Sequence, residues 1–92
     1  MKVHVHYYGQ LRHLADREGE TLELADDREL LRALRTASDG YDDGFSKVLF
    51  NGGEAICSSV MMLVNDKPVR GGTIPALRDG DSVSLIPAIS GG

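Results

Sequence analysis

Apolar and polar residues alternate over the first eight positions of the chain, as they do in a strand with one buried face. The positions expected to face the core are Val3, Val5 and Tyr7. The positions expected to face away from it are Lys2, His4, His6 and Tyr8. The next segment, 10–20, has two leucines three positions apart followed by Gly19, which indicates a helical turn or a loop.

Alternation returns at Leu22 and Leu24 and predicts a second strand that pairs with the first. The segment after it has a helical spacing of apolar residues. Its apolar stripe consists of Leu30, Leu31, Leu34 and Ala37. Asp26 or Asp27 can cap this helix and Gly40 can end it, so we expect one main helix between these positions.

The second half of the chain predicts two longer strands with a short one between them. Residues 60–64 are densely apolar, and a last strand is expected at about 82–86 after a turn. The short strand is expected near Val69. Segment 41–57 has turn signals on both sides of a short apolar stretch, and we expect a loop with one helical turn there.

This order of elements predicts an α+β fold for a single domain that spans residues 1–92. One helix can cover only one face of a four- to five-stranded sheet, so the other face is expected to meet solvent or a partner. The chain has 92 residues, of which 41% are hydrophobic. That is enough for one small core and needs no second domain.

Charge and cysteine content narrow the class of partner and the compartment. Ten Lys and Arg against fourteen Asp and Glu give a formal charge of −4, which argues against nucleic acid or an anionic membrane as the main partner. Cys57 has no second cysteine for a disulfide. The sequence shows neither an apolar leader nor an apolar run of about 18 residues, so we expect a cytoplasmic location.

The segment SVSLIPAISGG leads from the last strand into Gly91 and Gly92. Because glycines lack Cβ, they let an extended backbone enter a narrow channel and leave the terminal carbonyl unhindered. A carboxylate is a poor acyl donor and must first be coupled to a better leaving group before a sulfur or nitrogen nucleophile can replace that group. We interpret the two glycines as a reactive terminus, and a chance pair of glycines is the alternative.

Two stretches carry a resemblance to a known family: YYGQLRHLA after the first strand and LRDGDSVSLIPAISGG at the end. With the order of elements, they make the chain similar to the ubiquitin-like sulfur carriers, which include the small subunit of molybdopterin synthase and the thiamine-pathway carrier. The resemblance implies a β-grasp fold with a mixed sheet and a flexible tail at about 88–92. It also implies that the carboxylate of Gly92, preceded by Gly91, is the functional group.

What the resemblance implies for function is a carrier that is itself no enzyme. A ubiquitin-activating-type adenylating enzyme would consume ATP to activate Gly92, and a sulfur donor would convert it to a thiocarboxylate for molybdopterin synthesis. The expected partners are that enzyme, the sulfur donor and the large subunit of an acceptor synthase, with no cofactor bound to the chain. Thiamine, thiolated nucleobases and cysteine stay open as products, as do a modifier attached to lysines and a plain binding module.

A partner surface is predicted on the sheet face that the helix leaves uncovered. Alternation turns Met61 and Leu63 away from the helix, and it does the same for Ile86 in the last strand. The strand order implied by the family brings these residues beside the first strand. The predicted surface next to the glycine tail consists of Tyr8, Met61, Leu63, Ile86 and Pro87. The alternative is that segment 41–57 folds over this face and buries it.

Two histidines and the cysteine give weaker evidence for a functional site than the two glycines do. His4 and His6 share a strand face, but no third ligand stands at a suitable spacing, so we expect no metal site. The sequence neighbours of Cys57 are Ala55, Ile56 and serines, none of which is a basic group that would lower the thiol pKa. We interpret Cys57 as a structural or incidental thiol.

Overall fold

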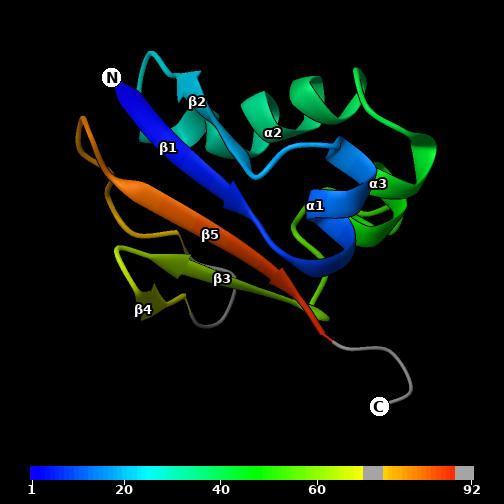
Figure 1. The fold of residues 1–92 in the computed structure, drawn as a ribbon. Coiled ribbons are helices and arrows are strands. Elements are labelled where there is room, and N and C mark those ends of the chain that lie inside the picture. The colour runs from blue at the N-terminus through cyan, green and yellow to red at the C-terminus, as the bar shows by residue number, and fades with distance from the viewer. Residues whose placement is uncertain (70–73, 89–92) are drawn as a thin grey trace.

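A five-stranded sheet carries helices on one of its faces (Figure 1). The structure is a computed structural model and describes residues 1–69 and 74–88. The strands are β1 (Lys2–Tyr7), β2 (Gly19–Glu23), β3 (Val60–Val64), β4 (Lys67–Pro68) and β5 (Ser82–Pro87). The helices are α1 (Gly9–Ala15), α2 (Leu30–Ser38) and α3 (Asp43–Leu49), with a 3-10 turn, η1 (Asp27–Glu29), ahead of α2.

The strand order in the sheet is β2-β1-β5-β3-β4, so the last strand lies in its centre. β5 runs parallel to β1, whereas the β1–β2, β3–β5 and β3–β4 pairs are antiparallel. A parallel pair needs a long crossover connection, and the segment with the helices is part of it. The predicted α+β class and the mixed sheet are confirmed.

The core lies between the helices and one face of the sheet. Its strand residues are those whose side chains alternation turns toward the helices: Val3, Val5, Tyr7, Val60, Met62, Val64, Val83 and Leu85. Its helix residues are Leu11, Ala15, Leu30, Leu34, Phe45 and Leu49. Each large side chain buried here stabilises the fold by about 1.5–3 kcal/mol. The covered face therefore holds the hydrophobic core of the described chain.

Helix α2 forms where its leucine stripe predicts it. The Asp26 carboxylate caps the preceding η1 turn by accepting a hydrogen bond from Arg28 N at 2.8 Å. Leu30 and Leu34 are fully buried beneath it. Within residues 1–69 and 74–88, no helix has the length and apolar character needed to cross a membrane.

Segment 41–57 differs from the expected loop, because it contains the seven-residue helix α3. Asp42 caps this helix by accepting a hydrogen bond from Gly44 N at 2.9 Å. A Cβ at Gly44 would lie 3.1 Å from Leu14 Cδ2, so the close packing of α3 on α1 favours glycine in the first turn. Glycine is a poor helix former, and its presence here weakened the helical signal in the sequence.

The side chains of α3 face the core and not the open face of the sheet. Phe45 and Leu49 are fully buried, and the Phe45 ring meets the Tyr7 ring edge-on with 5.2 Å between centroids. The expectation of a single covering helix was therefore incomplete, because α1 and α3 cover the same face as α2. The expected short strand is also displaced slightly, from Val69 to Lys67–Pro68, although Val69 N still donates to Met62 O at 2.9 Å.

Candidate functional site

The last strand is fixed on both sides up to the start of the predicted tail. Tyr8 N donates a hydrogen bond to Leu85 O at 3.2 Å, and Ala88 N donates one to Ser59 O at 2.7 Å. Ala88 is the last described residue, so the predicted functional residues Gly91 and Gly92 lie outside the described part of the chain. What the structure shows is the hydrogen-bonded end of β5 that precedes these residues.

The turn from β1 into α1 packs close to the end of β5. Gly9 has a φ of +54°, a left-handed conformation that favours glycine. A Cβ at Gly9 would lie 3.4 Å from Pro87 Cγ, which is already van der Waals contact. Pro87 is half-buried in this position. The turn therefore holds Tyr8 beside the end of β5.

Four residues of the predicted partner surface, Tyr8, Met61, Leu63 and Ile86, lie on the sheet face away from the helices. The fifth, Pro87, is the cross-strand partner of the core residue Val60 and so lies on the helix side, which corrects its predicted place. Met61 and Ile86 are direct cross-strand partners in the β3–β5 pair, and Leu63 stands opposite Ser84 in the same ladder. Met61 is 55% exposed and Tyr8 45% exposed, which makes them the two large apolar side chains most open to solvent in the described chain. Leu63, Ile86 and Pro87 are half-buried. Tyr8, Met61, Leu63 and Ile86 are called the open-face surface below.

Segment 41–57 does not cover the open-face surface, which removes the alternative raised by the sequence. Its large apolar residues, Phe45, Leu49 and Phe50, belong to the core on the other side of the sheet. The open-face surface is therefore accessible as far as this segment is concerned. A contiguous exposed apolar patch is typical of an interaction site.

The rest of the open face is polar. His4 and His6 lie beside Ser82 and Ser84 in the β1–β5 register. His4 Nδ1 is 2.9 Å from Thr21 Oγ1, so its contact is a hydroxyl and not a metal ligand. In the described residues, no group of three or more His, Cys, Asp or Glu side chains could hold a metal ion.

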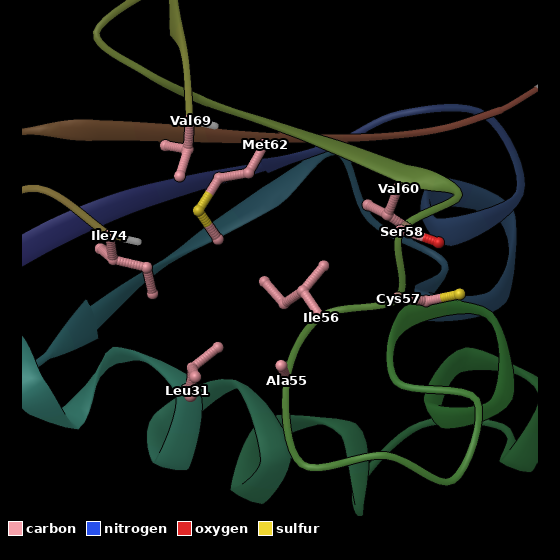
Figure 2. Close-up of a pocket in the computed structure, with 9 residues that line it drawn as sticks. All are labelled: Leu31, Ala55, Ile56, Cys57, Ser58, Val60, Met62, Val69 and Ile74. Carbon is pink, nitrogen blue, oxygen red and sulfur yellow. The ribbon is translucent and has the colours of Figure 1, made fainter. Parts of the chain in front are cut away.

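A cavity of about 380 Å³ opens on the helix side of the sheet, and Cys57 lies at its border (Figure 2). Leu31 of α2, Ile56 and Met62 of β3 give it an apolar lining. In Figure 2 the Cys57 sulfur points away from the centre of the cavity. Cys57 therefore borders the cavity without presenting its thiol to an occupant.

Cys57 has a hydrogen-bond contact that affects its thiol pKa and that the sequence analysis did not identify. Its Sγ is 3.1 Å from Ser59 Oγ, and this hydrogen bond lowers the pKa of the Cys57 thiol. Ser59 also accepts the backbone bond from Ala88. The signal in the sequence for this lowered pKa was Ser59, two positions after the cysteine, and not a basic residue.

Sequence reasoning also missed a buried polar cluster at the end of β1. The hydroxyls of Tyr7 and Tyr41 both donate hydrogen bonds to Glu20 Oε2. Arg17 Nη1 lies 3.9 Å from Glu20 Oε1, and the Arg17 guanidinium stands 5.5 Å from the Tyr41 ring centroid. Burial, followed by the Glu20 contact, raises the pKa of Tyr7 and of Tyr41. The cluster ties the start of α3 to β1 and β2.

Comparison with protein families identifies this architecture. The model of the ThiS family matches residues 5–92, which is nearly the whole chain. The chain belongs to the ThiS family. This is a family of ubiquitin-like sulfur carriers and modifiers, and the sheet of this member, with the last strand between the first and third, has the β-grasp fold.

Solved structures show the same fold. The small archaeal modifier protein 1 from Methanosarcina acetivorans is 25% identical with a TM-score of 0.77, over 99% of this chain and 96% of that one. A putative molybdopterin converting factor subunit 1 from Pyrococcus furiosus is 29% identical with a TM-score of 0.68, over 97% and 99%. A chain from a complex of subunits 1 and 2 of molybdopterin-converting factor from Helicobacter pylori is 24% identical with a TM-score of 0.60, over 100% of this chain and 100% of that one. The comparison with curated proteins finds no match.

Proposed function

We propose that this ThiS-family member is a sulfur carrier whose Gly92 carboxylate is adenylated and then converted to a thiocarboxylate. The observation that carries the proposal is the family match, which extends through residue 92 and so includes Gly91 and Gly92. The family resemblance implies that the carboxylate of the last of these glycines is the reactive group, and the proposal adopts that assignment. The hydrogen bonds that hold β5 as far as Ala88 support the proposal, because they give a partner a defined strand end from which to locate the tail.

The proposed chemistry takes place in the active site of a partner. The Gly92 carboxylate attacks the α-phosphorus of ATP and displaces pyrophosphate, which gives an acyl-adenylate. Hydrosulfide supplied by the sulfur donor then attacks the acyl carbon, the bond from that carbon to the phosphate oxygen breaks, and AMP leaves with one of the carboxyl oxygens, which gives the thiocarboxylate. The chain contributes only the acyl group, so in this proposal it is a substrate and carrier and not an enzyme, and ATP is consumed by the partner.

The open-face surface is the proposed docking site for the adenylating enzyme and for the large subunit of an acceptor synthase. It is apolar, with Tyr8 and Met61 exposed, and it includes Ile86 near the end of β5, the strand that leads into the glycines. The Helicobacter pylori neighbour is a subunit 1 in complex with subunit 2, which supports a large-subunit partner. The names of that neighbour and of the Pyrococcus furiosus protein favour molybdopterin synthesis as the destination of the sulfur.

Intact mass spectrometry tests the proposed conversion. The chain is incubated with an adenylating enzyme of the ubiquitin-activating type, ATP and a sulfur donor. We expect a mass increase that corresponds to the exchange of one oxygen for sulfur, located in the C-terminal peptide and absent when ATP is omitted. A chain that gains no sulfur with any such enzyme would remove the main support for the proposal.

Protein modification is a second candidate, favoured by the likeness to small archaeal modifier protein 1. The same acyl-adenylate would then be attacked by a lysine amine of another protein, with loss of AMP and formation of an isopeptide bond. Proteomics separates the two uses. Stable adducts with a Gly-Gly remnant on lysines support modification, whereas a free thiocarboxylate that a synthase consumes supports sulfur transfer.

A further inference from the structure

The outer edge of β2 is unpaired within the described residues. β2 stands at one end of the strand order, and no segment within 1–69 or 74–88 forms backbone bonds to its outer side. On its inner side, Leu24 N donates to Met1 O at 2.8 Å. Because alternate residues of an antiparallel strand bond to the partner, the amides and carbonyls of Thr21 and Glu23 point outward. This edge can pair with another extended chain.

A groove of about 420 Å³ runs beside this edge, between β2 and α2. Leu22 faces the helices because it is paired with Val3, whose side chain is in the core. Leu22, Ala33 and Ala37 are half-buried and form an apolar floor. A strand added to β2 would place every second side chain over this floor.

The groove is more acidic than basic. Glu20, Glu23 and Glu29 line it together with a single basic residue, Arg32. The Glu23 side chain is 71% exposed, and its Oε1 lies 4.0 Å from the N-terminal ammonium nitrogen, which is the limit of an ion pair. The surplus of carboxylates favours an occupant that carries Lys or Arg beside its apolar residues.

We propose that the edge of β2 and this groove bind an extended segment of a partner protein that has aliphatic side chains at alternate positions and Lys or Arg beside them. The backbone of the segment hydrogen-bonds to Thr21 and Glu23, and its aliphatic side chains rest on Leu22 and Ala33. A second copy of this chain fits poorly, because pairing of two β2 edges would bring glutamates of like charge together.

The site is separate from the open-face surface and does not depend on the sulfur-carrier proposal. β1 stands between β2 and β5, and the groove lies on the helix side of the sheet. A partner bound at β2 therefore leaves Met61 and Ile86 accessible. The chain could be held at this edge while its tail is used elsewhere.

Thr21 allows a substitution that changes only the outer edge. Thr21→Pro removes the outward N–H but no bond to β1, and proline is tolerated on an edge strand when its N–H faces solvent. Thr21→Val keeps the N–H. Both variants lose the hydroxyl that contacts His4, so the comparison isolates the backbone donor. Circular dichroism and the melting temperature establish that both variants fold.

Peptide selection tests the proposal with a defined probe. A phage-displayed library of random heptapeptides is selected against the folded chain, and enriched peptides are synthesised and titrated. We expect aliphatic residues at alternate positions with Lys or Arg, and a loss of affinity of about tenfold for Thr21→Pro but little change for Thr21→Val. Amide exchange should slow at Thr21 and Glu23 when the peptide binds.

Four results would overturn the proposal. Three of them are the absence of any enriched peptide, enrichment of peptides that bind equally well to Thr21→Pro, and chemical shift changes on peptide binding that are confined to the open-face surface. Concentration-dependent dimerisation that Thr21→Pro abolishes would identify a second copy as the occupant and would also contradict a peptide partner. Glu23→Lys provides a further check, since it should weaken basic peptides and not neutral ones.

Discussion

The two faces of the sheet are built from the same strands but serve different purposes. The covered face buries Val5, Met62 and Leu85 under three helices. The open face presents Met61 and Ile86, which are neighbours of these buried residues along the same strands. Neighbouring residues of one strand thus belong either to the core or to a surface. The comparison teaches that strand alternation divides this small domain into a side that holds the core and a side that leaves apolar residues open, where we propose that partners dock.

The largest expected loss in the free energy of unfolding comes from a substitution on the covered face. Phe45→Ala should lower the free energy of unfolding by about 3–5 kcal/mol, because it leaves a cavity beside Tyr7 in the core. The matched substitution on the open face, Met61→Ala, should change it by about 0.5 kcal/mol or less. Urea unfolding of both variants measures the difference. Equal losses at the two positions would mean that the open face is part of the core.

A charge on the open face should affect binding more than folding. Ile86→Asp should weaken binding to the adenylating enzyme by about tenfold or more, since a carboxylate would be buried in an apolar contact. Ile86 is half-buried, so we expect a stability cost of about 1 kcal/mol. Asn51→Asp adds the same charge at an exposed position at the end of α3 and serves as the control in calorimetric titrations.

Unfolding of the Ile86→Asp chain would contradict that prediction. Ile86 would then be a core residue, and the docking surface would have to lie elsewhere. Tight binding by a folded Ile86→Asp chain would leave the open-face surface without a role in recognition.

The tyrosine cluster makes the stability of the covered face depend on pH in the alkaline range. The pKa of Tyr7 is raised from 10.0 in the folded chain, so above about pH 10 the unfolded chain loses this proton first. The free energy of unfolding should then fall with a slope of up to about 1.4 kcal/mol per pH unit from this residue. Tyr7→Phe should lack this contribution when denaturant midpoints are compared between pH 9 and 11. Identical slopes would show that the hydroxyl of Tyr7 titrates normally.

The smallest effect concerns the helix that the sequence did not predict. Asp42→Ala removes the cap of α3 and should cost about 1 kcal/mol in the free energy of unfolding. Asp43→Ala removes an exposed carboxylate next to it that accepts no capping bond, and should cost less. A larger loss for Asp43→Ala would show that charge near the helix start, and not the capping bond, stabilises α3.

The strands and the two faces could be predicted because each long strand has one buried side. Val60, Met62 and Val64 alternate with Met61 and Leu63, and burial follows that alternation in the structure. Helix α2 was predictable for the same reason, since its leucine stripe and the cap at Asp26 agree. Local pattern was sufficient for the long strands and for α2, whose apolar residues repeat at the spacing of the element.

Other features depend on residues that are distant in the sequence. Helix α3 packs closely on α1 where Gly44 approaches Leu14, and the tyrosine cluster joins residues 7, 20 and 41. The two-residue strand β4 has too few residues for a pattern. The groove beside β2 exists only because the strand order leaves that strand at an edge. Such features become visible only after the topology is known.

The central claim is that the terminal carboxylate of Gly92 is the reactive group. Its most direct test is adenylate formation by the activating enzyme, measured as ATP–pyrophosphate exchange, with the chain as given and with a chain extended by one alanine after Gly92. We expect equal melting temperatures, because an exposed terminus contributes little to the core, and exchange only with the unextended chain. Exchange with the extended chain, without prior removal of the added residue, would contradict the account.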